Sequence, residues 1–438
     1  MPPAPPAALG FSPLDDELGL LPGSLTPQAQ AALVRLGAER EFAPAATLLA
    51  ALTGIQVSEP TARRHTYAGG ALLLAQQTAA APPLAPPADP GLARPSRLQV
   101  SVDGAMIPLV GGRWAEVKTL VVGEVVPILQ ADGTTRPQAT QLSYFSRLAP
   151  AATFIPLSVV ETHRRGLRAA AEVAAVLDGA EWLQGWTNYH CSDATRILDQ
   201  PHALEHLYAL AEALWGSGPV AKEWWAAQGA VLREQGPDPV LSAAVALAEQ
   251  AVNAEEYARQ LHYLQTRREQ MAYPQFVAAG WPVGSGIVES ANKLVVERRL
   301  KGAGMRWAEE HVNPLLALRN ALCSARWSEA VAVVGAGRRA AAGAARQARR
   351  AARGAGAPGE AGAGALSTAS APAGSLIDVT VVAQVTEILS QGGPTEVGSA
   401  QAFPSGDRRR PAANHPWRRS PLGKACAEPL RPFPYAKL

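Results

Sequence analysis

The sequence predicts an α+β protein, in which a mixed sheet carries an all-helical insertion and follows a small helical domain. Strand-like alternation of apolar and polar residues begins near residue 98 and recurs several times after it. Helical periodicity without strand signals fills about residues 203–276. A proline-rich linker at 79–96 separates the alternating region from helical patterns nearer the N-terminus.

Composition limits the classes of protein to which the chain can belong. No apolar run in its 438 residues approaches the roughly 20 that a membrane span requires. The first residues, MPPAPPAALG, lack the basic and apolar regions of a signal peptide. Cys191, Cys323 and Cys426 stand apart, without a CxxC pair. We therefore expect a cytoplasmic protein with no membrane partner.

The N-terminal region, residues 1–78, is predicted to be helical and to bind DNA. Thr26, followed by proline, is a helix start signal, and Gly54 ends a second helical pattern. The third pattern carries Arg63 and Arg64. A helix, a glycine turn and a short basic helix are typical of a helix-turn-helix. The alternative is a small helical bundle whose basic residues are merely solvated.

A catalytic domain is predicted over residues 97–330. Its strands are expected at residues 98–109, 114–126, 141–148, 173–177 and 194–198. A helix is expected at about 154–170, and the helical insertion of about 203–276 follows the last strand. Three antiparallel strands, a helix, a strand, a helical segment and a further strand form the order of a ribonuclease-H-like mixed sheet.

The most informative stretch is WPVGSGIVESANKLVVERRLKGAGMRW, residues 281–307. Ser285 is the expected N-cap, and the apolar spacing after it predicts a helix with one buried stripe. Glu289 lies beside that stripe. The basic residues expected to face DNA phosphates are Lys293, Arg298, Arg299, Lys301 and Arg306. The alternative is a surface helix with a Glu289–Lys293 pair.

Three carboxylates occupy positions that predict a metal site. Asp103 lies within the first strand, Asp178 directly follows the fourth, and Glu289 is on the helix after the insertion. Acidic groups that converge from separate elements suit two hard cations, which together activate the attacking oxygen and stabilise the leaving one. The alternative for Asp103-Gly104 and Asp178-Gly179 is a pair of turn signals.

A second cluster starts where the fifth strand ends. Asp199 and His202 form a D-x-x-H element, and HALEH, residues 202–206, matches the H-x-x-E-H motif of zinc peptidases. Helical spacing places His202 and His206 on one face, with Glu205 between them, so a zinc metallopeptidase is an alternative function. In the structural alternative, His202 packs near Asp199 and His206 faces other helices.

Four segments, in this order, resemble bacterial insertion-sequence transposases of the ISKra type: VSVDGAMIPL, VAAVLDGAEWLQGW, ILDQPHALEHL and GSGIVESANKLVVERRLKGAGMRW. These are DDE enzymes on a ribonuclease-H-like fold, akin to Mutator-like transposases. The resemblance implies that Asp103, Asp178 and Glu289 are the catalytic, metal-binding triad, with Asp199 and His202 as an additional or alternative acidic site. It implies Mg²⁺ (or Mn²⁺) as cofactor.

The resemblance also implies the partners. The enzyme would cut and rejoin DNA at the terminal inverted repeats of its element and insert it into target DNA, as a homo-oligomer on DNA at the nucleoid. The chain departs from the family at Pro201, where an aromatic residue usually precedes the histidine. The tail from about residue 335 also has no counterpart in the family, so an inactive DNA-binding remnant is a further alternative.

The end of the chain, residues 331–438, is a low-complexity basic tail that we expect to be disordered. Its alanine, glycine and proline runs offer few large apolar side chains to bury. Alanine favours a helix at 338–353, but such a helix has no large apolar face with which to dock. The arginines of the tail are expected to add only nonspecific affinity for DNA.

Overall fold

The computed structural model describes residues 25–81 and 95–354. The expected linker lies largely outside these ranges, as do the expectations for residues 1–24 and 355–438. Among the helices of the two described ranges, none is long and apolar enough to cross a membrane.

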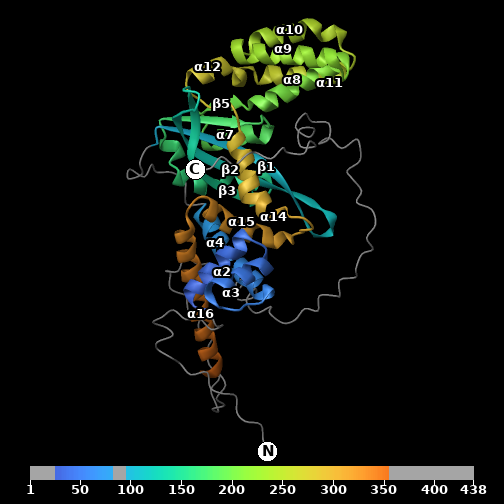
Figure 1. The fold of residues 1–438 in the computed structure, drawn as a ribbon. Helices are drawn as coiled ribbons and strands as arrows, with labels where there is room; N and C mark the ends of the chain where they lie inside the picture. Colours follow the sequence, from blue (N-terminus) through green and yellow to red (C-terminus); the bar gives the residue numbers. More distant parts are fainter. Residues whose placement is uncertain (1–24, 82–94, 355–438) are drawn as a thin grey trace, which may run out of the picture. The chain divides into compact units, whose positions relative to one another are not determined.

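Three helices form the N-terminal part, as expected (Figure 1). They are α2 (Pro27–Glu39), α3 (Phe42–Thr53) and α4 (Glu59–Ala80). The hydroxyl of Thr26 accepts a hydrogen bond from the Ala29 N–H at 3.2 Å and so caps α2. Gly54 ends α3 in the left-handed region, with φ 75°, which glycine adopts without a Cβ clash.

A five-stranded mixed sheet forms the centre of the α+β fold (Figure 1). Its strands are β1 (Arg97–Pro108), β2 (Trp114–Leu129), β3 (Thr135–Leu148), β4 (Glu172–Leu177) and β5 (Thr195–Leu198). The spatial order is β3-β2-β1-β4-β5. β2 runs antiparallel to both of its neighbours, whereas β1, β4 and β5 are parallel to one another. All five predicted strands are confirmed.

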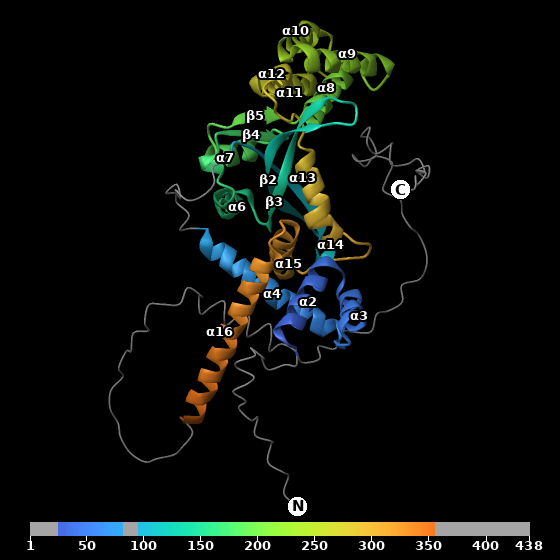
Figure 2. The ribbon, with the colours of Figure 1, turned by 60° about the vertical axis from the view of Figure 1, so that its left-hand side comes forward.

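Different helices cover the two faces of the sheet. α5 (Ala151–Leu157), α6 (Val159–Arg164) and α7 (Glu181–His190) pack with one face, around Val100, Leu120 and Trp186. The opposite face packs against α13 (Gly286–Ala291) and α15 (Glu309–Cys323), around Ile107 and Val117. Figure 2 shows α13 and α14 (Arg298–Leu300) running along this second face.

The single helix expected over 154–170 is wrong in its extent, because the chain forms the two short helices α5 and α6 there. Pro156, inside α5, has no N–H to donate to a helical hydrogen bond. Gly166, just after α6, takes a left-handed φ of 63° that a continuing helix does not allow.

The insertion between β5 and α13 is all-helical, as predicted. It comprises α8 (Gln200–Trp215), α9 (Pro219–Gln235), α10 (Pro237–Leu247), α11 (Ala254–Thr266) and α12 (Tyr273–Ala278). These helices share a core with β4 and β5 that includes Val176, Leu207 and Tyr257. The insertion therefore packs directly on the parallel edge of the sheet.

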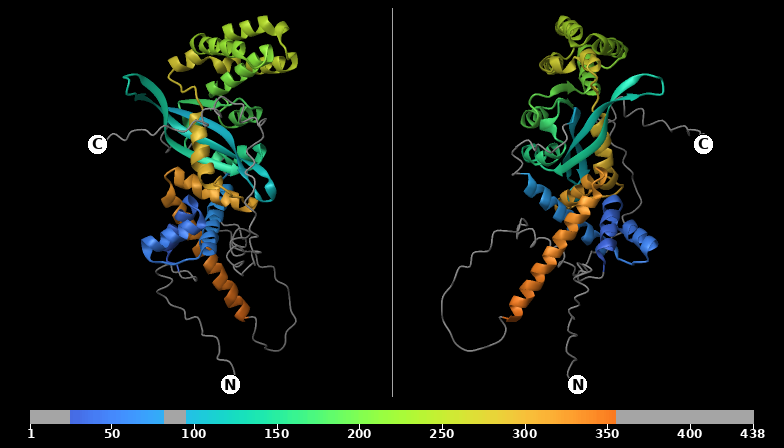
Figure 3. Two further views of the ribbon diagram at one scale, coloured as in Figure 1. Left: turned by 45° about the vertical axis from the view of Figure 1, so that its right-hand side comes forward. Right: turned by 90° about the vertical axis from the view of Figure 1, so that its left-hand side faces the viewer.

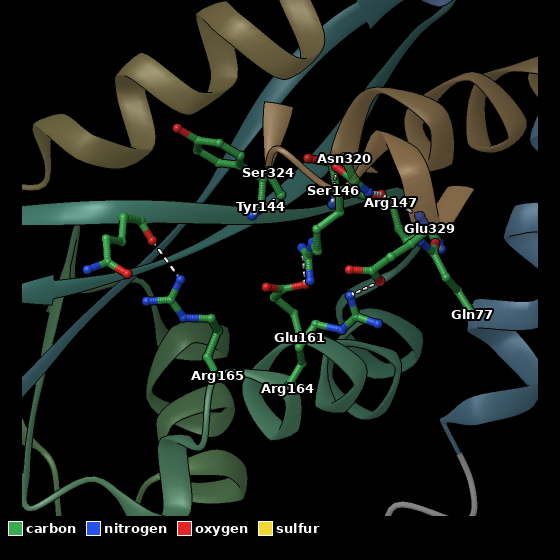
Figure 4. A network of polar contacts seen from close by, with 12 residues as sticks. Gln77, Tyr144, Ser146, Arg147, Glu161, Arg164, Arg165, Asn320, Ser324 and Glu329 are labelled. Carbon is green, nitrogen blue, oxygen red and sulfur yellow. Dashed lines mark hydrogen bonds and ion pairs between the residues drawn. The ribbon is translucent and has the colours of Figure 1, made fainter. Parts of the chain in front are cut away.

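α15 covers the opposite edge of the sheet through side-chain amides. Asn320 accepts a hydrogen bond from the Ser146 N–H at 3.1 Å and donates to the Ser146 carbonyl at 3.2 Å (Figure 4). Asn313 makes the same pair of bonds with Leu148, at 2.8 and 3.0 Å. Two asparagines thus take the place of a neighbouring strand along β3, which satisfies its free backbone groups.

Two ion pairs bind the C-terminal part of the described chain to α6 (Figure 4). Arg326 lies 2.7 Å from Glu161, whose side chain is nearly buried, and Arg164 lies 2.5 Å from Glu329. A buried pair fixes geometry more strongly than an exposed one, because both charges depend on it for solvation.

The predicted tail boundary at 331 is wrong, because it falls inside α16 (Trp327–Gly354) (Figure 3). The first half of α16 packs on α4, with Val334 against Leu72. Small residues make this possible: a Cβ on Gly337 would lie 2.6 Å from a methyl group of Leu72. These contacts precede residues 338–353, the segment for which a helix without a docking face was expected.

The replacement Gly337→Leu is expected to lower the free energy of unfolding by about 1–3 kcal/mol, because the new side chain overlaps Leu72. Gly343→Leu is the matched control in the same helix, since no atom lies within 4 Å of its added Cβ. There, better helix propensity is expected to stabilise slightly. Urea unfolding measures both, and equal effects would mean that α16 does not pack on α4.

Candidate active site at the ends of strands β4 and β5

Three aspartates stand level with one another across the parallel strands. The last pair between β1 and β4 is Val100 with Ala175. Continuing that register by three residues places Asp103 opposite Asp178. The β4–β5 register, carried one residue on, sets Asp178 level with Asp199. In-register neighbours of parallel strands point to the same face. The ends of β4 and β5 therefore bring acidic side chains together beside β1.

Asp103 is held by two hydrogen bonds. The Gly104 N–H donates to its Oδ1 at 2.6 Å, and the Asn292 amide donates to its Oδ2 at 2.9 Å. Burial raises the pKa of Asp103 to about 6, the Gly104 bond opposes the rise, and the charge of Asp178 adds to it. A carboxylate with a raised pKa beside a second carboxylate is stabilised by a cation.

Asp178 ends β4 in a turn that the insertion braces. Its Oδ1 accepts a hydrogen bond from the Ala180 N–H at 2.8 Å. From α11, the Tyr263 hydroxyl donates to the Asp178 carbonyl at 2.7 Å. Arg267 donates to the Gly179 carbonyl at 2.9 and 2.6 Å. The helical insertion thus fixes the position of the second carboxylate.

Asp199 is fully buried, and both of its oxygens accept hydrogen bonds. Oδ1 accepts from the Ser285 N–H at 2.5 Å. Oδ2 accepts from the His202 N–H at 3.2 Å and lies 2.6 Å from Nδ1 of the same residue. Burial opposes ionisation of Asp199, but the bonds from His202 and Ser285 outweigh it and lower the pKa. Asp199 therefore caps α8 and anchors the start of α13.

The prediction that the Ser285 hydroxyl caps the following helix is wrong. Its side chain makes no capping bond, and its backbone N–H is used by Asp199 instead. A long-range partner has replaced the local one.

His202 carries a positive charge into this cluster. Its hydrogen bond to Asp199 raises its pKa to about 9 despite burial, and the charges of Asp199, Glu205 and Asp178 add to the rise. At neutral pH the imidazole is therefore protonated. Its charge also acts on Asp103, whose pKa it lowers. This cation offsets part of the negative charge of the neighbouring carboxylates.

Glu289 is exposed on α13, which packs against β1 and β2. It lies three residues before Asn292, so both belong to neighbouring positions on one helix face. In the part of the chain that the structure describes, no three His, Cys, Asp or Glu side chains gather closely enough to hold a metal ion. The structure thus groups Asp103 with Asp178, but does not draw Glu289 into a closed ligand set.

Asn292 is a site residue that the sequence did not reveal. It is 6% exposed, and its Oδ1 has no hydrogen-bond partner although its Nδ2 binds Asp103. The π-helix η5 (Asn292–Glu297) begins at this residue, and such segments are frequent at functional sites. An amide oxygen is a ligand type that Mg²⁺ accepts, so the orphan oxygen beside Asp103 suits a divalent cation.

The predicted basic contacts divide into exposed and buried residues. Lys293, Arg298, Arg306 and Arg63 are exposed, Arg64 is half-buried, and Lys301 pairs with Glu297 at 2.7 Å. Arg299 is only 2% exposed and donates to the Gly37 carbonyl at 3.1 Å. Burial lowers its pKa to about 10. The prediction that Arg299 contacts DNA is therefore wrong, since its side chain packs against the N-terminal helices.

The two histidines of HALEH have separate partners. His202 pairs with Asp199, whereas Nδ1 of His206 lies 2.6 Å from the Gln260 amide oxygen. The His206 ring also stacks on Tyr263, with centroids 3.6 Å apart. A protonated imidazole does not ligate zinc, and His202 is protonated at neutral pH.

We expect the purified protein to hold no stoichiometric zinc at HALEH. The physical reason is the strong His202–Asp199 pair, which a zinc ion would have to break. Metal analysis of the wild type and of His206→Ala tests this. One tightly bound zinc that disappears in His206→Ala would contradict the prediction and favour the metallopeptidase.

Comparison with known proteins assigns the chain to no family: no protein-family model matches it, and no curated protein matches it.

Proposed function

We propose that the chain is a DDE transposase that cuts and rejoins DNA at the ends of an insertion sequence. The observation that carries the proposal is the level placement of Asp103, in β1, and Asp178, directly after the parallel strand β4. The strand order β3-β2-β1-β4-β5, with only β2 antiparallel to its neighbours, supports a ribonuclease-H-like fold.

The proposed cofactor is Mg²⁺ or Mn²⁺, which prefers oxygen ligands of the kind that these carboxylates offer. Asp103 and Asp178 would hold the metal, with Glu289 joining from α13. When bound, the metal supplies activation of the attacking oxygen and neutralises charge that develops on the phosphate. Asp178 is the better candidate for the second ligand, because Asp199 is fully buried and already paired with the His202 imidazolium.

The surrounding side chains would prepare the carboxylates and the substrate. Asn292 and the Gly104 N–H orient the two oxygens of Asp103. The His202 imidazolium would offset part of the carboxylates' negative charge, and Asp199 fixes the orientation of its ring. Binding and orientation of this kind supply a large part of catalysis in phosphoryl transfer.

The proposed reaction has two steps at one site. In the first, a water oxygen attacks phosphorus, the P–O3′ bond breaks, and a 3′-hydroxyl is freed at the element end. In the second, that hydroxyl attacks a phosphodiester of target DNA, and the target strand's own P–O bond breaks. Each step replaces one phosphorus–oxygen bond with another, so no oxidant or energy source is required.

The test is cleavage of duplex DNA that carries the repeats flanking the gene. We expect nicking at the element ends in Mg²⁺ or Mn²⁺ and none in EDTA. The products should carry 3′-hydroxyl ends, which a polymerase extends. Binding to these ends without cleavage would favour the inactive remnant. The absence of both binding and cleavage would overturn the proposal.

We expect binding to the element ends to weaken steeply as salt rises, because Arg63 is exposed on α4 and can meet phosphates. Arg63→Ala should lower the salt dependence by about one counterion. Titrations of the full chain at several salt concentrations measure this. Arg136→Ala, a change at an exposed arginine of the β2–β3 hairpin, is the control. Salt-independent binding would assign the N-terminal helices a structural role.

A further inference from the structure

A cavity of about 550 Å³ lies between the N-terminal helices and the segment that joins α14 to α15. Residues from α3 and α4 form one wall, including Arg63 and Tyr67. Arg306 and His311 belong to the other. Its volume is within the range of small-ligand sites. The cavity is separate from the carboxylate cluster around Asp103.

The cations of this cavity favour an anion. Arg63 and Arg306 are exposed and come from distant parts of the chain. Arg299 lines the cavity too, is buried, and has no hydrogen-bond partner for Nη2. A buried cation without a full set of partners raises the positive potential around it, because a low-dielectric surrounding screens it poorly.

The aromatic residues favour a flat group beside that anion. Tyr67 and His311 are stacked, with ring centroids 4.0 Å apart and planes 17° apart. Phe42 meets Tyr67 edge to face at 5.3 Å. His311 is only half-buried and lines the cavity. Nucleobases stack on such rings irrespective of sequence.

Two carboxylates limit the ligand to one phosphate and one base. Glu41 and Glu59 line the same cavity, where they would repel a run of closely spaced phosphates. The same groups can accept hydrogen bonds from the amino groups of a base. The mixture of charges therefore suits a single nucleotide better than the backbone of a duplex.

We propose that this cavity binds one unpaired nucleotide, with its phosphate at Arg63 and Arg306 and its base at His311. The proposal rests on the proposed function only for the source of that nucleotide, which would be an unpaired position at a DNA end. A free nucleotide has the same chemistry, and the experiment separates the two sources.

The test is calorimetric titration of the full chain, without divalent metal, using inorganic phosphate, thymidine monophosphate, a short oligothymidylate and a blunt duplex. We expect the oligothymidylate to bind more tightly than the duplex or phosphate. His311→Ala should weaken it by roughly 5- to 100-fold, the worth of one stacked base. His311→Phe should restore most of the affinity, because the aromatic face returns.

Arg306→Ala should weaken oligothymidylate binding and lower its salt dependence by about one counterion. Arg136→Ala, far along the chain on the exposed hairpin, should leave both unchanged. Unfolding midpoints check that each variant is folded. Equal affinity for thymidine monophosphate and oligothymidylate would support the cavity but assign it a free nucleotide.

Wild-type affinity in both His311→Ala and Arg306→Ala, or equal affinity for phosphate alone, would overturn the proposal. The outcome is independent of DNA cleavage, since no metal is present. If the protein binds oligothymidylate through His311 but does not cleave DNA when metal is added, the nucleotide site is supported and the proposed transposase activity is not.

Discussion

Asp103→Asn is expected to lower the rate of DNA cleavage by roughly 10²–10³-fold or more while the protein stays folded. The change removes one of the two level carboxylates, and with it the charge that would hold the proposed cation. The fold should tolerate it, because the new amide can keep the bond from the Gly104 N–H and donate to the orphan Oδ1 of Asn292. Single-turnover cleavage measures the loss.

A second readout does not depend on activity. Mg²⁺ that binds the folded state raises the unfolding midpoint of the wild type, and this rise should vanish in Asp103→Asn. Asp193→Asn is the control, since Asp193 is exposed in the loop before β5. Full cleavage by Asp103→Asn, or an unchanged Mg²⁺ effect, would remove Asp103 from the site.

Asp199→Ala is expected to destabilise the protein by about 3–5 kcal/mol, because it leaves His202 and the Ser285 N–H without their buried partner. Asn253→Ala is a matched control: Asn253 also caps a helix, at 3.1 Å from the Glu256 N–H, but in an exposed position. Loss of that cap should cost only about 1 kcal/mol. Urea unfolding gives both values, and equal losses would contradict the buried pair.

The same pair predicts how stability changes with pH. The pKa of His202 is raised from 6.5 to about 9 on folding, so its contribution is complete below pH 6.5 and is lost as pH rises through 9. The pKa of Asp199 is lowered, so its contribution is lost as pH falls below the ordinary range of a carboxyl. The wild type should therefore lose stability between pH 6.5 and 9, and Asp199→Ala should lose less.

Local patterns in the sequence were enough to predict the strands and the first two carboxylates. Alternation indicates which residues of β1 face each side of the sheet. Asp103 lies within β1 and Asp178 directly follows β4, where burial makes an unpaired charge costly. The helix start at Thr26 also depends on nearest neighbours alone. Such features require no knowledge of the rest of the chain.

Other features depend on contacts between distant residues. A charged side chain such as that of Arg299 is expected to face solvent. Arg299 instead lies one helical turn after Val295 and Val296, which are buried. The π-helix shifts the helical phase, so a regular helical wheel misplaces the residues that follow it. Asn292 gave no signal, because an amide near a helix start is ordinary until Asp103 is known to touch it.

The hydrogen bond between Asp199 and Ser285 has a consequence for how the length of the segment between them can change. These residues stand 86 positions apart, yet a hydrogen bond of 2.5 Å joins them, and the Gln200 N–H donates to the Val283 carbonyl beside it at 3.0 Å. The helices between them are therefore a module closed at its base. Lengthening or shortening that module would leave the spacing from β5 to α13 intact, because loop closure costs little more as a loop grows. A change in the length of this module would therefore leave the join between β5 and α13 unchanged.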